Sequence, residues 1–335
     1  NYIKLDLPEG PTILAYGRDP YFDGWSLNYG NPALQATLIE ELLKISQRCD
    51  GLRCDMAMLV LPEIFQRTWS IGSEPFWPIA IHRVREQHPD FVFMAEVYWD
   101  FEWPLQQQGF DYTYDKRLYD RLRGQQARPV REHFWADLDY QKKSARFLEN
   151  HDEPRAAATF PPGIHEAAAV LTYFSPGLRF FHQGQLQGWP KKISVHLCRG
   201  PEQLSDPSLQ EFYRRLIDAL RLSVFRNGDW QLLECKPAWA GNWTRDCFIA
   251  FAWQGADGQR AIAVVNYAPN QSQCSIPLPW PDLGGQMYQL EDLMSSAVYD
   301  RTGDSLLSPG LYMDLPAWGY GVYQLIQKTI IKTNK

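Results

Sequence analysis

The chain has 335 residues, of which 45% are hydrophobic and 21% are charged, and its formal net charge is −6. This is the composition of an ordinary globular protein with enough chain for one large domain and one small one. The acidic balance argues against nucleic acid or an anionic membrane surface as the main partner. No run of about 18 apolar residues occurs, so the sequence predicts no transmembrane helix.

The six cysteines are scattered along the chain. Cys49 and Cys54 have no matching second pair, so no zinc site is predicted. The density of cysteines is also too low for a disulfide scaffold. The opening residues NYIKLDLPEG contain no basic segment followed by an apolar one, so no signal peptide is visible. We expect reduced, structural thiols in a cytoplasmic protein.

Helical and strand patterns alternate over the first two thirds of the chain. Residues 1–32 are expected to be an irregular lead-in loop, because Gly, Pro, Asp and Asn recur in GRDPYFDGWSLNYGNP. Apolar periodicity then predicts helices over 33–48, 74–87, 116–123, 131–140, 163–174 and 208–223. Strands are predicted over 51–55, 91–95, 110–114, 145–149 and 178–182. Alternation at this spacing is typical of parallel βαβ units.

The pattern changes after about residue 228. Strand-like runs separated by turn residues follow, with no long helix between them, over 247–253, 260–268, 273–280, 286–293 and 310–326. We therefore expect an α/β domain over 1–228 and a small all-β, antiparallel domain over 229–330.

Three carboxylates stand where predicted parallel strands end. Asp55 follows the apolar run in GLRCDMAML, Glu96 follows that in FVFMAEVYW, and Asp152 follows that in FLENHDEPR. In parallel α/β folds the C-terminal ends of the strands meet at one face, so we expect these side chains to converge. Glycoside hydrolysis needs two facing carboxylates, one as nucleophile and one as proton donor, and a third acid can stabilise the oxocarbenium-like transition state.

The neighbours of these carboxylates suit such roles. Arg53 and Asp55 are two apart on a strand and share a face, so the guanidinium is expected to keep Asp55 ionised. Apolar residues surround Glu96 in the sequence, and an apolar setting raises the pKa of a carboxyl group, as a general acid requires. His151 can donate to a sugar hydroxyl. Each feature alone has a simpler structural explanation, such as a helix cap or an ion pair, but all three in order on successive βα units are much more specific.

These stretches resemble motifs of the α-amylase family of glycoside hydrolases. GLRCDMAML is similar to the motif on the family's fourth barrel strand, FMAEVYW to that on the fifth, and FLENHDEPR to that on the seventh. SPGLRFFHQGQ resembles the eighth-strand segment, and the closing region, which ends GLYMDLPAWGYGVYQL, resembles the family's C-terminal β-sandwich. The resemblance covers nearly the whole chain. It implies an α/β fold, a (β/α)8 TIM barrel followed by a small antiparallel β-sandwich domain.

The resemblance also implies roles for individual residues. Asp55 would be the nucleophile, Glu96 the general acid/base, and Asp152 the group that stabilises the transition state. Arg53 would orient Asp55, and His151 would contact the sugar in the −1 subsite. Members of the family cleave or transfer α-glucosidic bonds with retention of configuration.

Aromatic residues near the motifs are candidates for stacking on sugar rings. Tyr98, Trp99 and Phe65 are the substrate-binding candidates, although each could instead belong to the core. His182 and Gln183, at the end of the last parallel strand, are expected to face the same mouth, with an ordinary polar strand end as the alternative.

The sequence departs from the family pattern in two ways. Cys54 and Met56 flank Asp55 where Val, Phe or Leu are commoner, which is expected to affect packing only. The family's third-strand motif, which carries an Asn and a His, has no counterpart in residues 1–50. We therefore expect a partial barrel, strands four to eight, in the C-terminal portion of a longer protein, because a partial barrel would expose two parallel edges. Since the Asn of that motif often helps to hold a structural calcium, this chain gives no support for calcium and the sequence leaves calcium dependence open; no other metal site and no cofactor are predicted.

Three functions remain open at this point. The leading one is a retaining hydrolase of α-glucosidic bonds in α-glucans or maltooligosaccharides, which works through a covalent glycosyl-enzyme intermediate. An α-glucan transglycosylase or isomerising synthase of the same family uses the same intermediate. An inactive glycan-binding fragment or homologue is disfavoured because all three carboxylates are present. The sequence leaves the glucan linkage, the preferred chain length and the oligomeric state open.

Overall fold

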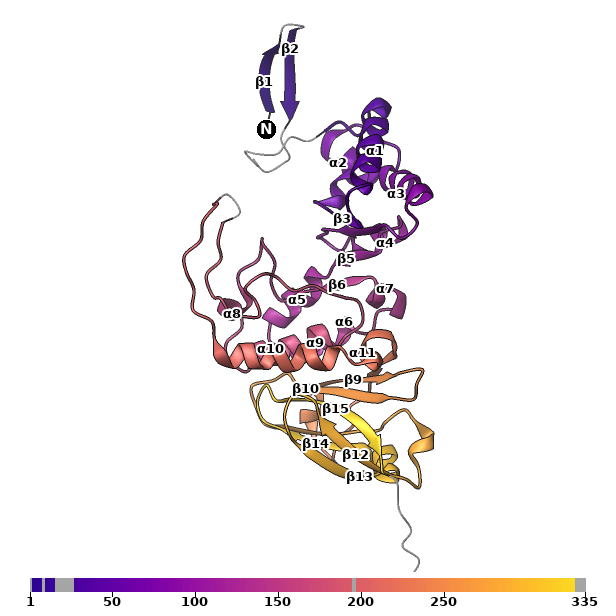
Figure 1. Ribbon diagram of the computed structural model, residues 1–335, viewed down its shortest axis with the longest axis vertical. Coiled ribbons are helices and arrows are strands. Elements are labelled where there is room, and N and C mark those ends of the chain that lie inside the picture. Colours follow the sequence, from indigo (N-terminus) through magenta and orange to yellow (C-terminus); the bar gives the residue numbers. More distant parts are fainter. Residues whose placement is uncertain (1, 8–9, 16–26, 195–196, 329–335) are drawn as a thin grey trace, which may run out of the picture. The chain divides into compact units, whose positions relative to one another are not determined.

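The computed structural model describes residues 2–7, 10–15, 27–194 and 197–328 (Figure 1). The side chains of residues 2–7 and 10–15 are outside this description. The chain divides into two compact units, Asn1–Tyr114 and Asp115–Lys335. The boundary expected from the sequence, between 228 and 229, separates an α/β domain from an all-β domain. The division into compact units does not test it, so it stays a prediction.

The first unit begins with a two-stranded antiparallel hairpin, β1 (Tyr2–Leu7) and β2 (Gly10–Ala15). The prediction of an irregular lead-in over residues 1–32 is therefore wrong for these two strands. The Gly- and Pro-rich composition of 17–32 dominated that prediction, whereas Ile3, Leu5 and Leu7 alternate with polar residues at the strand period of two. Much of the predicted loop, residues 16–26, lies outside the described residues.

A parallel sheet forms the centre of the first unit. Strands β3 (Gly51–Cys54), β4 (Val92–Ala95) and β5 (Tyr112–Tyr114) lie side by side in chain order. Helices connect and flank these strands: α1 (Pro32–Ser46), α2 (Pro62–Trp69), α3 (Phe76–Gln87) and α4 (Glu102–Gln107). The predicted strands and the helices over 33–48 and 74–87 are confirmed, and the sequence patterns missed the short helices α2 and α4.

Local sequence signals explain where these elements begin. Helix α1 starts at Pro32 because the side-chain oxygen of Asn31 accepts the amide of Ala33 at 3.0 Å, and proline suits the first helical position. Strand β3 starts at Gly51, where an added Cβ would lie 2.6 Å from the carbonyl oxygen of Val92. Glycine therefore permits the close approach of β3 to β4.

The second unit begins with a smaller α/β part. Parallel strands β6 (Ser144–Arg146) and β7 (Leu178–Arg179) pair with each other. The helices of this part are α5 (Lys116–Arg123), α6 (Ala127–His133), α7 (Leu138–Lys142), α8 (Ala156–Thr159), α9 (Ile164–Tyr173), α10 (Pro207–Leu220) and α11 (Ser223–Asn227). The helices predicted over 116–123, 163–174 and 208–223 are confirmed, and both strands are shorter than predicted.

The prediction of one helix over 131–140 is wrong, because the helical conformation is interrupted between α6 and α7. Phe134, at the break, is buried and packs its ring 4.9 Å from the ring of Phe251, while the next residue, Trp135, is exposed. Asp137, with non-helical backbone angles of φ −53° and ψ 148°, is then the N-cap residue of α7. Packing of Phe134 against the β domain overrides the continuous helical pattern.

The β domain has two layers. The larger sheet has the antiparallel strand order β13-β12-β15-β10-β9-β8 and the smaller one pairs β11 with β14. The strands are β8 (Asp229–Leu233), β9 (Phe248–Gln254), β10 (Arg260–Asn266), β11 (Ser272–Ile276), β12 (Met287–Asp292), β13 (Val298–Thr302), β14 (Leu311–Leu315) and β15 (Tyr320–Gln327). The buried core contains residues of both sheets, including Phe248, Val264, Ile276 and Met313.

The predicted antiparallel β domain is thus confirmed as a fold, with one correction. The run over 310–326 is two strands, β14 and β15, which belong to different sheets. Pro316 and Trp318, which has a left-handed φ of 58°, separate them. The other face of the larger sheet meets the helices, where the indole nitrogen of Trp253 donates to the carbonyl of Phe174 at 2.8 Å.

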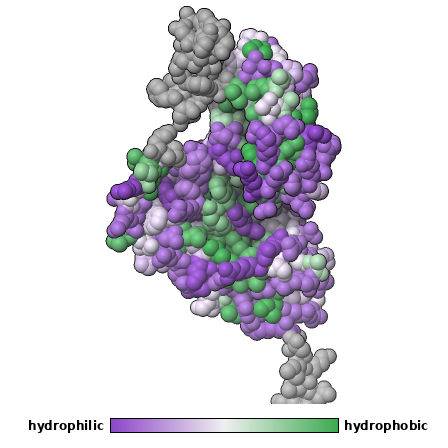
Figure 2. Space-filling view, turned by 45° about the horizontal axis from the view of Figure 1, so that its top comes forward, coloured by the Kyte–Doolittle hydropathy of each residue, from purple (hydrophilic) through white to green (hydrophobic). Residues whose placement is uncertain are grey.

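In the parts of the chain that are described, no helix is both long enough and apolar enough to cross a membrane. Hydrophilic residues cover much of the face shown in Figure 2, with patches of apolar residues between them.

The six cysteines all lie in described segments and are free thiols, of which Cys54, Cys235, Cys247 and Cys274 are buried. The (β/α)8 barrel itself, partial or complete, stays a prediction.

Candidate active site

Two of the three predicted carboxylates come together in the first unit. Asp55 follows the last residue of β3 and Glu96 follows the last residue of β4. These strands are parallel neighbours with Cys54 opposite Ala95, so the residues after them leave the same edge of the sheet. The amide of Glu96 donates to the carbonyl of Cys54 at 2.9 Å, which continues the ladder up to the site.

Arg53 joins the two carboxylates. Its Nη1 donates to Oδ1 of Asp55, and its Nη2 lies 2.8 Å from Oε1 of Glu96. Its Nε donates to the hydroxyl of Tyr114 at 3.3 Å, and the guanidinium lies over the Tyr114 ring. Burial alone would lower the pKa of Arg53, but hydrogen bonds to Tyr114 and Asp55 more than offset it and raise that pKa. The guanidinium is therefore a permanent cation between two acids.

The two carboxylates have opposite surroundings. The side chain of Asp55 is 78% exposed, whereas that of Glu96 is 4% exposed. Glu96 accepts the amide of Met56 at 2.8 Å and the hydroxyl of Tyr98 at 3.0 Å. Burial raises the pKa of Glu96 above its ordinary value, against the opposing effects of the Met56 amide, Arg53 and Tyr98. The direction is that predicted from the apolar sequence around Glu96.

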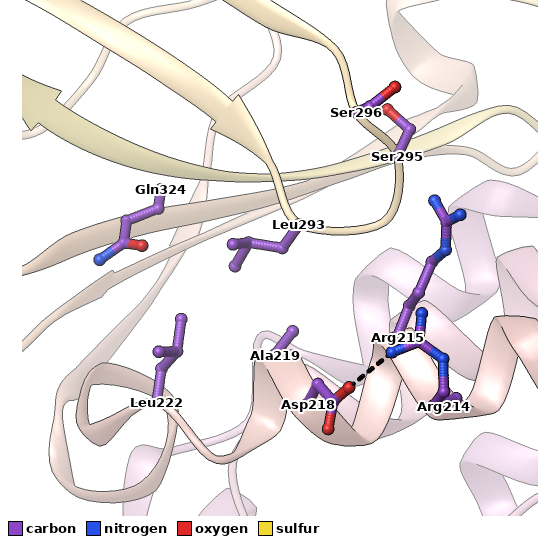
Figure 3. Close-up of a pocket in the computed structure, with 9 residues that line it drawn as sticks. All are labelled: Arg214, Arg215, Asp218, Ala219, Leu222, Leu293, Ser295, Ser296 and Gln324. Carbon is purple, nitrogen blue, oxygen red and sulfur yellow. Dashed lines mark hydrogen bonds and ion pairs between the residues drawn. The ribbon is translucent and has the colours of Figure 1, made fainter.

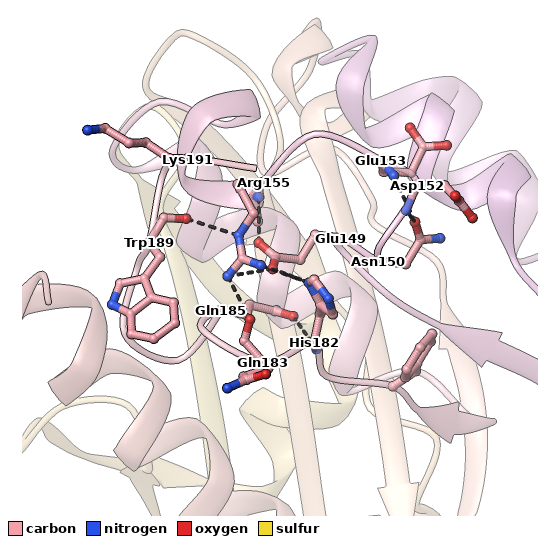
Figure 4. Close-up of polar contacts among 12 residues, drawn as sticks. Glu149, Asn150, Asp152, Glu153, Arg155, His182, Gln183, Gln185, Trp189 and Lys191 are labelled. Carbon is pink, nitrogen blue, oxygen red and sulfur yellow. Dashed lines mark hydrogen bonds and ion pairs between the residues drawn. The ribbon is translucent and has the colours of Figure 1, made fainter. Parts of the chain in front are cut away.

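The third carboxylate, Asp152, belongs to the second unit. Its Oδ2 lies 3.1 Å from Nε2 of His151, and both side chains are partly exposed. The side-chain oxygen of Asn150 accepts the amides of Asp152 and Glu153 at 2.9 and 2.8 Å, which holds this loop in a turn (Figure 4). The expected convergence of Asp152 with Asp55 and Glu96 stays a prediction.

The predicted aromatic candidates lie in three different settings. Trp99 is 66% exposed, as a stacking residue needs to be. Tyr98 is half-buried and uses its hydroxyl on Glu96. Phe65 is 3% exposed in α2, with its ring 6.0 Å from that of Tyr29. A ring buried in this way offers no face to a ligand, so Phe65 belongs to the core.

Sequence reasoning missed a buried polar group in the second unit. Glu149, 1% exposed, accepts the amide of Ala156 at 2.7 Å and lies 3.1 Å from Nη2 of Arg155 and 3.0 Å from Nδ1 of His182 (Figure 4). Arg155 also donates to the carbonyl of Gln183 at 2.8 Å. This group ties the loop after β6 to the loop after β7. The signal in the sequence that could have indicated this buried group is Glu149 itself, an acidic residue directly after the apolar pair Phe147 and Leu148.

A separate pocket of about 450 Å³ lies in the second unit (Figure 3). Residues of α10 and of the short connection after it line one side, and residues of the loop after β12 and of β15 line the other. They are Arg214, Arg215, Asp218, Ala219, Leu222, Leu293, Ser295, Ser296 and Gln324. None of them is a predicted site residue, and ion pairs to Glu211 engage both arginines.

Within the described residues, no group of three or more His, Cys, Asp or Glu side chains is arranged to hold a metal ion.

Solved structures of α-amylases share this architecture. A noncanonic maltogenic α-amylase from Thermotoga neapolitana superimposes with a TM-score of 0.68 and 17% identity, covering 92% of this chain and 70% of that one. An Anoxybacillus α-amylase gives 0.69 and 18%, with coverage of 92% and 66%. The Geobacillus thermoleovorans α-amylase, complexed with acarbose, gives 0.67 and 17%, with coverage of 92% and 67%.

The chain thus spans about two thirds of the length of these structures. No protein-family model and no curated protein sequence matches it. At these identities the likeness concerns the fold, and it confirms at that level the resemblance seen in the motifs. Over 92% of its length, this chain has the fold of the α-amylases.

Proposed function

We propose that this chain carries the catalytic acids of a retaining glycoside hydrolase that acts on α-glucosidic bonds of α-glucans or maltooligosaccharides. The observation that carries the proposal is the pairing made by Arg53, which contacts one exposed carboxylate, Asp55, and one buried carboxylate, Glu96. Glycoside hydrolysis with retention requires two acids in different protonation states. The α-amylase fold and the acarbose complex of one structural neighbour agree with a glucan substrate.

In this mechanism Asp55, exposed and held by Arg53, attacks the anomeric carbon and forms the covalent glycosyl-enzyme. Glu96, whose pKa burial raises, gives its proton to the departing glycosidic oxygen. It then takes a proton from the water that hydrolyses the intermediate, which restores both carboxyl groups. Asp152 stabilises the positive charge of the transition state, and His151 donates to a sugar hydroxyl.

Substitution of the nucleophile tests the proposal. In the full-length protein as its host makes it, Asp55→Asn should reduce the rate of maltooligosaccharide hydrolysis by on the order of 10³-fold or more. A matched control is Asp139→Asn on α7, which alters an ion pair with Lys143, the residue after this helix, and should leave activity unchanged. If Asp55→Asn retains the wild-type rate, Asp55 is not the nucleophile. If the wild-type protein hydrolyses no α-glucan, the proposed function is wrong.

A further inference from the structure

The carboxyl group of Glu96 is held by three partners. Its Oε2 accepts the backbone amide of Met56 at 2.8 Å. Its Oε1 accepts the hydroxyl of Tyr98 at 3.0 Å and lies 2.8 Å from Nη2 of Arg53. The Met56 amide and the Tyr98 hydroxyl each donate a hydrogen bond and Arg53 adds a positive charge, so this geometry suits the ionised carboxylate. A general acid must also exist in the protonated form, and its proton then needs an acceptor.

The three partners differ in what they can do. A backbone amide and a guanidinium only donate, whereas a phenolic hydroxyl donates or accepts depending on how its hydrogen is turned. Oε2 accepts the Met56 amide with one lone pair, and a proton on its other lone pair has no acceptor among the described contacts of this carboxyl group. A proton on Oε1 can point at the oxygen of Tyr98 once that hydroxyl rotates, and Oε1 keeps a lone pair for Arg53.

We propose that Tyr98 is the positioning residue that lets Glu96 both hold and release a proton. Among the contacts that the described part of the chain gives this carboxyl group, the Tyr98 hydroxyl is the one that can switch from donor to acceptor. Protonated Glu96 then carries its hydrogen on Oε1, facing Tyr98. The inference rests on the proposed role of Glu96 as general acid/base, and it assigns Tyr98 a task other than sugar stacking.

The backbone on both sides of the site is shaped for these contacts. Met56 has left-handed angles, φ 42° and ψ 45°, and presents its amide to Oε2. Tyr98, two residues after Glu96, is followed by Trp99 and Asp100, whose φ values of 59° and 65° are also left-handed. Non-glycine residues rarely adopt this conformation, and they collect where surrounding structure enforces it. The turn keeps Tyr98 over Glu96 while Trp99 points into solvent.

The charged and titratable groups around Glu96 allow this assignment. Arg53, from β3, stays charged, and Asp55, after β3, is mostly exposed. Tyr114, from β5, is engaged by Nε of Arg53. The proton held at this site therefore belongs to Glu96, and Tyr98 is the neighbour that adapts to it.

Carbon-13 NMR of the full-length protein, labelled at the side-chain carboxyl carbon of glutamate, tests the proposal without needing activity. The Glu96 signal is identified by its absence in Glu96→Gln. In Tyr98→Phe the ionised form loses a charge-assisted hydrogen bond and the neutral form loses a weaker one. The pKa of Glu96 should therefore rise by about 0.5 to 1 unit.

A second variant moves the pKa in the opposite direction. Incorporation of 3-fluorotyrosine in place of Tyr98 makes the phenol a stronger donor and a weaker acceptor with almost no change of shape, so the pKa of Glu96 should fall. Tyr112→Phe removes a hydroxyl from β5 that is not among the described contacts of Glu96, and should leave the pKa in place. An unchanged pKa in both Tyr98 variants would overturn the proposal.

Activity separates this inference from the proposed function. If the protein is a glycosidase, the high-pH limb of its profile of kcat/KM against pH should shift to higher pH in Tyr98→Phe. This shift should match the rise in the pKa of Glu96 measured by NMR. If the pKa moves but no α-glucan is cleaved by the wild type, Tyr98 still controls the proton on Glu96 and the proposed reaction is wrong.

Discussion

Arg53 and Glu96 lie 2.8 Å apart, Nη2 to Oε1, although they come from different strands. The same guanidinium contacts Asp55, so one partly buried cation faces both acids. A carboxylate with 4% exposure would be costly without such a partner. This contact is the centre of the candidate site and the basis for the first prediction.

Arg53→Met should lower kcat/KM on α-glucans by on the order of 10²-fold or more, because a preorganised charge is lost from both acids. Removal of the cation favours the protonated form of Glu96, so the pKa of Glu96 rises further. The high-pH limb of the pH–rate profile therefore shifts to higher pH. Arg53→Lys keeps the charge but not the fork that reaches two carboxylates. Arg53→Lys should therefore lower kcat/KM, but it should shift the high-pH limb of the pH–rate profile less than Arg53→Met does. If this limb lies at the same pH in both variants, the prediction is wrong.

Protonation of Glu96 should also be visible in stability. Its pKa is raised in the folded protein, so between the unfolded and folded pKa values the folded state binds more protons. The resulting stabilisation is fully present below the unfolded pKa and is lost as the pH rises through the folded pKa. Glu96→Gln cannot titrate, so wild type should lose stability relative to this variant as the pH rises.

Denaturant unfolding of wild type and Glu96→Gln at pH 4 and pH 8 measures this difference. Glu86→Gln, which removes an exposed carboxylate that pairs with Arg83 on α3, is the matched control. A pH-independent stability difference between wild type and Glu96→Gln would show that the raised pKa is absent.

Trp99→Ala should weaken substrate binding without unfolding the protein. Trp99 is 66% exposed and follows Glu96 by three residues. Stacking on an aromatic ring contributes about 0.5–1.5 kcal/mol, so KM for maltooligosaccharides should rise by about two- to tenfold. Trp135→Ala removes an equally exposed indole (65%) from the second unit and should leave KM unchanged. Equal effects of the two substitutions would mean that Trp99 has no special place at the site.

Gly51→Ala should separate β3 from β4. The new Cβ would lie 2.6 Å from the carbonyl oxygen and 2.9 Å from Cβ of Val92, so the strands must move. We expect a loss of about 1–3 kcal/mol in the free energy of unfolding, with a loss of activity because Asp55 and Glu96 leave these two strands. Gly72→Ala, whose nearest contact would be the Gln66 side chain at 3.4 Å, is the control. Thermal unfolding of both variants decides the matter.

Glu149→Ala should be strongly destabilising. It leaves Arg155, 6% exposed, and the amide of Ala156 without their buried acceptor. Breaking a buried ion pair from one side costs about 3–5 kcal/mol. Glu202→Ala, an exposed glutamate before α10, should change stability little. A small effect of Glu149→Ala on chemical denaturation would mean that water takes over the contacts of Glu149.

Short-range signals in the sequence predicted most of the secondary structure. Helix α1 follows from Asn31, Pro32 and an apolar period, and the strands of the sheets follow from apolar runs between turn residues. The hairpin β1–β2 was missed although its local alternation encodes it, whereas the helix over 131–140 failed because a distant contact decides: Phe134 ends α6 by packing on the β domain. A distant contact also separates the two alternatives for Phe65, which lies in the core against Tyr29.

The sequence by itself determined which acids stand at strand ends, their order along the chain, and the resemblance that named their roles. Each of these is a property of residue type and local spacing. Only the tertiary structure decided how the acids are paired and solvated. Met56 and Glu96 are 40 residues apart, and Glu149 and His182 are 33 apart, yet each pair is in contact. Such contacts depend on how strands and loops pack, which no local pattern encodes.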